Sequence, residues 1–307
     1  MVQKLKNTLK KVAIYGQSYS ISAEKEMQIL LEVLNKNNIV SFIEDKFYDL
    51  LVDGNILDKK YPTFSHFSDL NNSFDAMFTL GGDGTILRAV TYIRDLNIPI
   101  LGINTGRLGF LAIINKKTIK ESINLILNGE FSIQERTLLS VRTSPKTASF
   151  KELDFALNEV TIARKNTTSM IGVKTSLNNE YLTNYWADGL IIATPTGSTG
   201  YSLSCNGPVI SPDSKNFIIT PIAPHNLNAR PMVISDKTSI QLTVDSREKD
   251  FLISLDSRIT TVPKNTEVFI EKAAFTIQSI IPKNQSFLQT LRTKLLWGED
   301  TRNETNL

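Results

Sequence analysis

Hydrophobic positions in the first third of the chain alternate between short continuous runs and helical spacing. Four runs have the length and composition of buried strands: residues 11–16, 38–44, 74–80 and 98–103. Helical spacing follows Ser22, which we expect to be an N-cap, and returns over residues 86–96. Strands that alternate with helices are typical of a parallel sheet covered by helices, so we predict a Rossmann-like α/β domain over residues 1–130.

The pattern changes near residue 131. Runs of β-branched residues, many of them alternating with polar ones, are then separated by turns of Asn, Asp, Lys and Pro. This predicts an all-β domain of two packed sheets, a β-sandwich, over residues 131–283. Helical spacing returns over residues 286–297, and since a lone helix must bury its apolar face, we expect residues 284–307 to pack back on the first domain.

Residues 52–70 contain two adjacent lysines, Pro62 and several aromatic residues. This stretch is predicted to be a mobile loop of the first domain.

Composition and charge restrict the classes of function. The 34 basic and 31 acidic residues give a net charge of +3, which is too small an excess for a nucleic-acid partner. A single cysteine, Cys205, and two histidines, His66 and His225, exclude an internal disulfide and argue against a zinc site. The apolar run after the basic start is too short for a signal sequence, and no stretch approaches the roughly 20 apolar residues of a membrane span. We therefore expect a cytoplasmic protein with no membrane partner.

The strongest local motif is the Gly-Gly-Asp-Gly-Thr sequence that follows the run at 74–80. Gly81, Gly82 and Gly84 let the backbone approach a ligand closely, and the amides at the start of the following helix suit a phosphate. A carboxylate at Asp83 would repel phosphate unless it binds a metal or an acceptor hydroxyl, and phosphoryl transfer needs both roles. The alternative is a tight turn with Asp83 as the N-cap. No Walker-type GxxxxGK[ST] sequence is present.

A second glycine loop follows the next predicted strand, over residues 101–112. It contains Gly102, Gly106 and Gly109, interleaved with Asn104, Arg107 and Phe110. Neighbouring parallel strands end side by side, so this loop is expected to line the same crevice, unless it is simply another turn.

A third group of polar residues lies in the β-rich half. Asn158 and Glu159 precede one apolar run, Asp188 precedes another, and residues 196–201 are rich in hydroxyls and glycine. Small hydrogen-bonding residues suit the recognition of a nucleoside and its ribose. The alternatives are a solvated strand end and a hydroxyl-rich turn.

Together these segments closely resemble the NAD kinase family. The matching blocks span about residues 74–260 and occur in the family's order: FTLGGDGT, GINTGRLGFLA, ALNEVTI, ADGLIIATPTGSTGYSLSCNGPVISP and ITPIAPHNLNARPMVI. The resemblance implies transfer of the γ-phosphoryl group of ATP, or a phosphoryl group of polyphosphate, to the 2′-hydroxyl of the adenosine ribose of NAD. It also implies Mg²⁺ or another divalent metal, with no assured protein ligand for the ion.

The resemblance assigns roles residue by residue. Asp83 matches the general base, and the ATP-phosphate site is formed by Gly81, Gly82, Gly84, Thr85 and Arg88. Asn158 and Glu159 match the pair that holds the adenosine part of NAD, and Asp188 the acid near its nicotinamide end. The full set expected at NAD is Asp83, Gly84, Arg88, Asn158, Glu159, Trp186, Asp188, Thr196, Thr199, Gly200, Tyr201, Ser202, Ser204 and Arg258. His225 lies in another family block, and we expect it to be structural.

Four positions depart from the family pattern. Gly200 stands where alanine is usual, Trp186 where a basic residue is frequent, and Ser169 and Arg258 replace His and Gln. These changes bear on the contacts with the dinucleotide and on the choice between NAD and NADH.

Other classes share only part of the pattern. Diacylglycerol and sphingosine kinases resemble the chain in the GGDGT motif alone, and a phosphofructokinase-type enzyme would have an α/β second half. A nucleotide-binding sensor without activity would not need Asp83. The apolar strands of the β half predict a homodimer or homotetramer.

Overall fold

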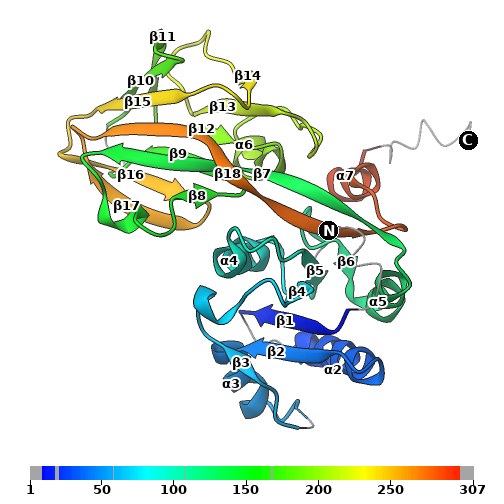
Figure 1. The fold of residues 1–307 in the computed structure, drawn as a ribbon. Coiled ribbons are helices and arrows are strands. Elements are labelled where there is room, and N and C mark those ends of the chain that lie inside the picture. The colour runs from blue at the N-terminus through cyan, green and yellow to red at the C-terminus, as the bar shows by residue number, and fades with distance from the viewer. Residues whose placement is uncertain (1–8, 18–20, 58, 107, 167–168, 298–307) are drawn as a thin grey trace, which may run out of the picture. The chain divides into compact units, whose positions relative to one another are not determined.

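The structure is a computed structural model that describes residues 9–17, 21–57, 59–106, 108–166 and 169–297. The chain forms two compact units, one of Met1–Glu135 with Ile277–Leu307 and one of Arg136–Thr276. Strands β7 (Phe131–Ser144) and β18 (Glu267–Pro282) each contribute residues to both units (Figure 1). No described helix is both long and apolar enough to cross a membrane.

The first unit is built on a parallel sheet in the order β3–β2–β1–β4–β5. The strands are β1 (Lys11–Gly16), β2 (Val40–Glu44), β3 (Thr63–Phe64), β4 (Ala76–Leu80) and β5 (Ile100–Asn104), with β6 (Ile114–Asn115) beside β5. Every residue of β4 and β5 is buried, which explains their continuous apolar runs.

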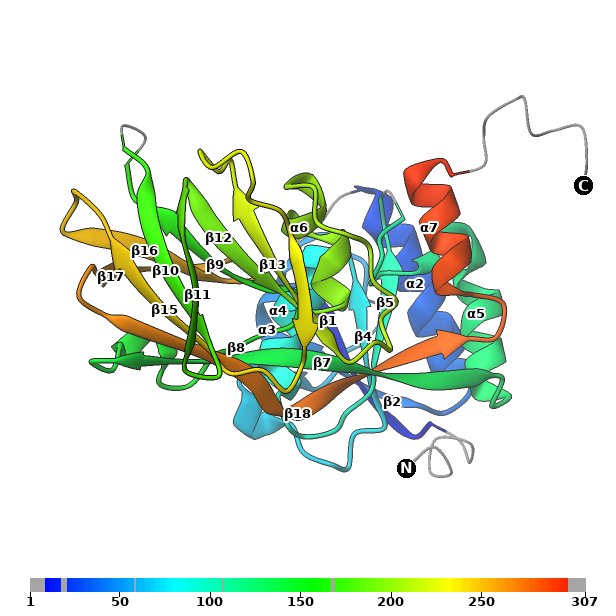
Figure 2. The same cartoon turned by 90° about the horizontal axis from the view of Figure 1, so that it is seen from above.

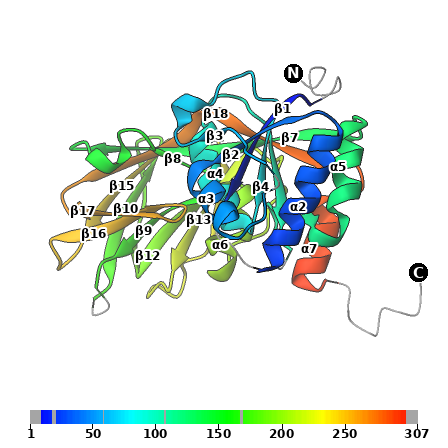
Figure 3. The same cartoon turned by 90° about the horizontal axis from the view of Figure 1, so that it is seen from below.

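The helices of this unit are α2 (Ile21–Lys36), α3 (Asp45–Asp53), α4 (Asp83–Ile93), α5 (Ile119–Leu127) and α7 (Phe287–Leu295). Helices α2 and α5 pack side by side, and Figure 3 shows them on the face of the sheet opposite to α4. Ser286 caps α7 by accepting a hydrogen bond from the Gln289 amide at 3.1 Å, and Leu291 is buried, as the predicted return of this helix to the first unit requires.

Two local predictions for this unit need correction. Ser22 is not an N-cap, because α2 begins at Ile21 and includes it. Residues 52–70 are not a bare loop: β3 pairs with β2, and a 3₁₀ helix, η1 (Phe67–Asp69), follows. The side chains of Tyr61 and Phe64 are both buried; Tyr61 belongs to the core of the first unit, and the Phe64 ring contacts Tyr92 on α4.

The second unit contains two antiparallel sheets, in agreement with the predicted all-β half. One sheet has the order β14–β13–β12–β9–β16–β17, and the other contains β11–β10–β15–β18 with β7 and β8. The strands are β8 (Phe155–Ala156), β9 (Glu159–Arg164), β10 (Ile171–Leu177), β11 (Glu180–Ala187), β12 (Gly189–Ala193), β13 (Asn216–Ile222), β14 (Met232–Ser235), β15 (Ile240–Asp245), β16 (Asp250–Leu255) and β17 (Arg258–Pro263). Their buried faces share one apolar core.

Strands β12 and β13 depart from the alternating pattern because both of their faces are covered. Ile191, Ala193 and Ile218 form a second small core with Cys205 and Ile210. These last two residues belong to the segment that follows η4 (Thr196–Thr199) and α6 (Tyr201–Ser204). Figure 2 shows β12 and β13 side by side with α6 next to them. The hydroxyl-rich segment is thus packed on the sheet, not suspended as a free turn.

Candidate functional site

The Gly-Gly-Asp-Gly-Thr motif lies where β4 passes into α4 in the first unit. Gly82 is the N-cap of α4, and the Gly81 amide donates to the carbonyl of Ile103 at 3.0 Å, which ties the turn to the end of β5. Gly81 has a φ of +149°, and a Cβ there would meet Thr85 Oγ1 at 2.2 Å, so only glycine suits the position. Gly82 and Gly84 are exposed and have open space where a Cβ would stand. Their backbone is therefore accessible to a ligand.

The Asp83 carboxylate faces the second glycine loop. It accepts hydrogen bonds from the amides of Phe110 at 2.8 Å, Leu111 at 3.0 Å and Ala112 at 2.9 Å. A Cβ on Gly109 would lie 1.9 Å from Asp83 Oδ1, so this glycine makes room for the carboxylate. The two loops meet as predicted, and the alternative of Asp83 as an N-cap is wrong, because that position belongs to Gly82.

Arg88 is exposed on α4, one turn after the glycines. With the Gln17 amide oriented to place its oxygen toward the guanidinium, that oxygen accepts from Arg88 Nε at 2.8 Å and Nη1 at 3.1 Å. Gln17 follows the last residue of β1, so the ends of β1 and β4 jointly position this cation beside the glycine turn. Arg107, which we also predicted to line this region, lies outside the described residues.

Asn158 and Glu159 lie at the start of β9 in the second unit, against the turn at residues 196–201. A Cβ on Gly200 would stand 2.9 Å from Glu159 Oε2 and 3.3 Å from Asn158 Nδ2, and a Cβ on Gly197 would be 2.1 Å from the Asn158 carbonyl oxygen. Glycine at these positions allows the turn to pack directly on the pair.

Burial raises the pKa of Glu159 to about 8, and the charge of Asp256 acts in the same direction. The Tyr201 amide, which donates to the Glu159 carboxylate, opposes this shift. Glu159 is consequently a neutral carboxylic acid at pH 7, able both to donate and to accept a hydrogen bond.

Three buried polar atoms in this group have no hydrogen-bond partner among the described residues: Asn158 Oδ1, Glu159 Oε2 and Thr196 Oγ1. Buried polar groups in folded proteins are almost always paired, so each unpaired one calls for an explanation. Three of them on adjoining segments are the arrangement expected of a pocket for a polar ligand.

The turn that carries Thr196 is rigid. Ser198 Oγ donates to the Pro195 carbonyl at 2.7 Å and accepts from the Ile210 amide at 3.0 Å, while Thr199 Oγ1 donates to the Thr196 carbonyl at 3.2 Å. Ser202 is buried, with its hydroxyl 2.8 Å from Thr220 Oγ1. These hydroxyls hold the turn in shape, whereas Tyr201 and Ser204 are exposed.

The remaining predicted residues of the second unit have other partners. Asp188 forms an ion pair with Arg164 at 2.9 Å and is near enough to Tyr201 to raise its pKa, after burial, which is the larger cause. The Trp186 side chain is exposed, and its carbonyl accepts from the His225 amide at 2.8 Å. The Arg258 guanidinium donates to the carbonyls of Leu153 and Phe155, so part of its donor capacity serves the fold.

Asp256 is a residue that the sequence reasoning missed. It stands in a turn between two alternating strands, where an aspartate is ordinary and gives no signal of its own. Only its pairing with residues almost one hundred positions earlier reveals it.

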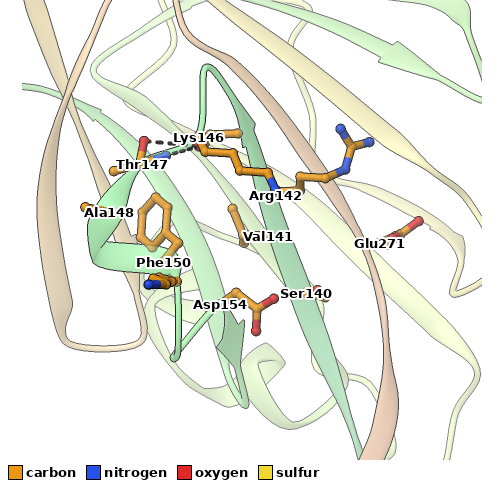
Figure 4. Close-up of a pocket in the computed structure, with 11 residues that line it drawn as sticks. Ser140, Val141, Arg142, Lys146, Thr147, Ala148, Phe150, Asp154 and Glu271 are labelled. Carbon is orange, nitrogen blue, oxygen red and sulfur yellow. Dashed lines mark hydrogen bonds between the residues drawn. The ribbon is translucent and has the colours of Figure 1, made fainter.

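A separate cavity of about 590 Å³ lies in the second unit, and none of the predicted site residues lines it. Figure 4 shows Arg142, Lys146, Asp154 and Glu271 around it, with Phe150 on one wall. Its charged lining is of both signs and exposed, so it contrasts with the buried, unpaired group around Glu159.

Comparison with known proteins gives a consistent result. Family models match two parts of the chain, the ATP-NAD kinase N-terminal domain over residues 3–131 and the ATP-NAD kinase C-terminal domain over residues 157–281. The NAD kinase of Christiangramia forsetii is 54% identical over 293 residues, which are 95% of this chain and 100% of that protein. The NAD kinase of Flavobacterium johnsoniae is 52% identical with the same coverage.

Solved structures share the fold at low identity. The yeast NADH kinase complexed with NADH superimposes with a TM-score of 0.85 at 22% identity, covering 97% of this chain and 90% of that one. The NAD kinase from Archaeoglobus fulgidus in complex with ATP gives a TM-score of 0.73 at 23% identity, covering 93% and 98%.

Replacing Gly109 by alanine should displace the Asp83 carboxylate from the amides of residues 110–112. We expect the free energy of unfolding to fall by about 2 kcal/mol, because three partly buried amides lose their carboxylate acceptor. Urea unfolding measures this. Gly106→Ala is the matched control in the same loop, since a Cβ there meets nothing within 4 Å. Equal stability of the two variants would contradict this account of Asp83.

Glu159→Gln should flatten the dependence of stability on pH. Glu159 keeps its proton in the folded state up to about pH 8, whereas the unfolded chain releases it above about 4.5. Between these values the folded state binds more protons, so the free energy of unfolding falls as pH rises, by up to about 1.4 kcal/mol per pH unit. Glutamine has no proton to release and removes this decline. Denaturant unfolding from pH 5 to 8 measures it, with the exposed Glu180→Gln as control; an unchanged slope in Glu159→Gln would refute the assignment.

Proposed function

This chain belongs to the NAD kinase family, and from that premise we propose that it transfers the γ-phosphoryl group of ATP to the 2′-hydroxyl of the adenosine ribose of NAD, giving NADP and ADP. In this proposal residues 1–130, together with residues 284–307, form the domain that supplies the phosphate site. Residues 131–283 form the domain that binds NAD.

The observation that carries the proposal is the group of unpaired buried atoms on Asn158, Glu159 and Thr196. An amide oxygen, a neutral carboxyl group and a hydroxyl together offer donors and acceptors that complement the hydroxyls of a ribose and the edge of a base. The glycines of the neighbouring turn keep side chains away from these atoms. A bound nucleoside would therefore satisfy groups that the protein leaves unpaired.

Asp83 is proposed to orient the attacking hydroxyl. Its two oxygens provide roughly four acceptor positions, and the amides of residues 110–112 use three of them. One acceptor position remains, on Oδ2, and it suffices for one substrate hydroxyl. Asp83 accepts the proton of that hydroxyl as the new O–P bond forms. Phosphoryl transfer depends mainly on position and charge neutralisation, so a firmly held carboxylate is suited to this task.

The phosphates of the donor are proposed to lie over Gly82 and Gly84 at the start of α4, with Arg88 neutralising part of their charge. Thr85 and Gly81 shape this turn from within, since the Thr85 side chain fills the space where a Cβ on Gly81 would be. No group of three or more His, Cys, Asp or Glu residues is placed to hold a metal ion in the described part of the chain. We propose that Mg²⁺ is held mainly by the ATP phosphates and water.

Self-association belongs to the same proposal. Leu227, Met232 and Val233 are exposed apolar residues on or before β14, which is an edge strand of its sheet. Such an edge suits a homodimer or homotetramer. Sedimentation velocity measures the assembly, and a monomer would contradict it.

The direct test is the formation of NADP by the purified protein with Mg²⁺. A panel of donors, ATP and polyphosphate, is combined with both acceptors, NAD and NADH. We expect NADP from ATP and NAD, as the curated relatives named NAD kinase suggest. Phosphorylation of diacylglycerol or sphingosine in place of NAD would contradict the proposal.

Asp83→Asn should lower kcat for NADP formation by about a thousandfold while the KM for ATP changes little. The amide cannot take the proton, and its NH₂ group would face the amides of residues 110–112. Asp75→Asn is the matched control, because Asp75 Oδ2 also accepts two backbone amides, from Lys10 and Lys11, just before β4 begins. Full turnover by Asp83→Asn would show that the carboxylate is structural only.

A further inference from the structure

The turn between β16 and β17 carries a carboxylate that binds three consecutive backbone amides. Asp256 Oδ2 accepts from the Leu157 amide at 3.0 Å, and Oδ1 accepts from Asn158 at 2.8 Å and Glu159 at 3.2 Å. The Asp256 amide in return donates to the Glu159 carbonyl at 2.9 Å. The β9–β16 ladder ends with the pair Val160 and Leu255. Beyond that pair, the Asp256 carboxylate is the acceptor for the backbone amides.

The carbonyl groups of the same segment are held from the opposite side. Thr194, just beyond the end of β12, donates through Oγ1 to the Leu157 carbonyl at 2.6 Å and through its amide to the Asn158 carbonyl at 2.9 Å. Because β9 lies between β12 and β16, Leu157 and Asn158 are fixed on both edges by side chains and backbone of the neighbouring strands. The segment remains extended past the end of its own strand.

The residues held in this way carry the side chains that the proposed NAD pocket needs. Asn158 Oδ1 and Glu159 Oε2 are buried without a partner, and both side chains lie within contact distance of a Cβ built on Gly200. A small rotation of the backbone at Leu157 or Asn158 would move these atoms against the rigid 196–201 turn or away from it. The positions of Asn158 Oδ1 and Glu159 Oε2 therefore depend on the hydrogen bonds that Asp256 accepts from the three amides.

Asp256 is the first residue of the two-residue turn between β16 and β17, and its carboxyl group is withdrawn from water. Its φ is +53°, in the left-handed region, and withdrawal of its carboxyl group from water raises its pKa in spite of the amides that lower it. The φ follows from the two-residue turn between Leu255 and Arg258, because tight hairpins of this length favour a positive φ at their first central residue. The turn does not require a buried carboxyl group, and this burial is explained if the carboxylate has to reach residues 157–159.

We propose that Asp256 is a positioning residue for NAD: it touches no substrate, and it sets the geometry of Asn158 and Glu159 by binding the amides of Leu157, Asn158 and Glu159. This inference rests on the proposed function, because it relates the three hydrogen bonds accepted by Asp256 to the binding of NAD, the acceptor substrate. The phosphate site of the first unit has no part in it, so the effect is confined to NAD.

The test compares Asp256→Asn and Asp256→Gly with the wild type. Asparagine keeps the size and one acceptor oxygen, whereas glycine accommodates the left-handed φ better than aspartate and removes the carboxylate entirely. We expect the KM for NAD to rise at least tenfold in both variants, with the KM for ATP within twofold. A loss that arose only from backbone strain would be absent in Asp256→Gly.

Asp236→Asn is the matched control. Asp236 is a buried aspartate of the same unit, paired with Lys272, and its hydrogen bonds do not involve residues 157–159. Its loss should lower the melting temperature and leave the KM for NAD unchanged. An equal rise of this KM in Asp236→Asn, or an unchanged KM in both Asp256 variants, would overturn the inference.

Amide hydrogen exchange separates this inference from the proposed function. Exchange at Leu157 and Asn158 should accelerate in the Asp256 variants and stay slow in Asp236→Asn, whatever the protein catalyses. A wild-type protein that makes no NADP contradicts the proposed function alone. A wild type that makes NADP, with Asp256 variants that retain its KM for NAD, contradicts only the role of Asp256.

Discussion

Backbone amides outside the strand ladders need acceptors where they are withdrawn from water, and in both units an aspartate provides them. Asp83 binds the amides of residues 110–112, and Asp256 binds those of residues 157–159. An unpaired buried amide would cost about 1–3 kcal/mol, so these carboxylates hold their loops firmly. The candidate phosphate site and the candidate nucleoside pocket each depend on one such contact.

The same contacts explain where glycine is required. Gly109 stands beside the Asp83 carboxylate, and Gly200 stands beside Glu159 and Asn158, at distances that a Cβ would violate or strain. In each case the glycine lets a loop approach an acidic side chain closely, independently of any unusual φ at these two positions. The family alanine at position 200 would press on Glu159 Oε2, so Gly200 leaves that carboxyl group more room in this chain.

Burial raises the pKa of both acids of the second unit, Glu159 and Asp256. The charge of Asp256 raises the pKa of Glu159 further, and Glu159 remains neutral at pH 7. A neutral carboxyl group binds an uncharged hydroxyl without repelling the pyrophosphate of a dinucleotide. Asp83, like Asp256, has three amide donors at its oxygens, and they hold it beside the accessible glycine turn of the first unit.

The sequence alone determined the α/β half, the all-β half, the returning C-terminal helix and the glycine motif, because hydrophobic periodicity and glycine spacing are local properties. It also brought the two glycine loops together, since parallel strands end at one edge. Local pattern could not reveal β3, because a two-residue strand has no period, nor Ser22 inside α2, because helix ends depend on packing. Asp256, the Arg258 contacts with Leu153 and Phe155, and the unpaired atoms around Glu159 were decided only by the tertiary structure, which joins segments about one hundred residues apart.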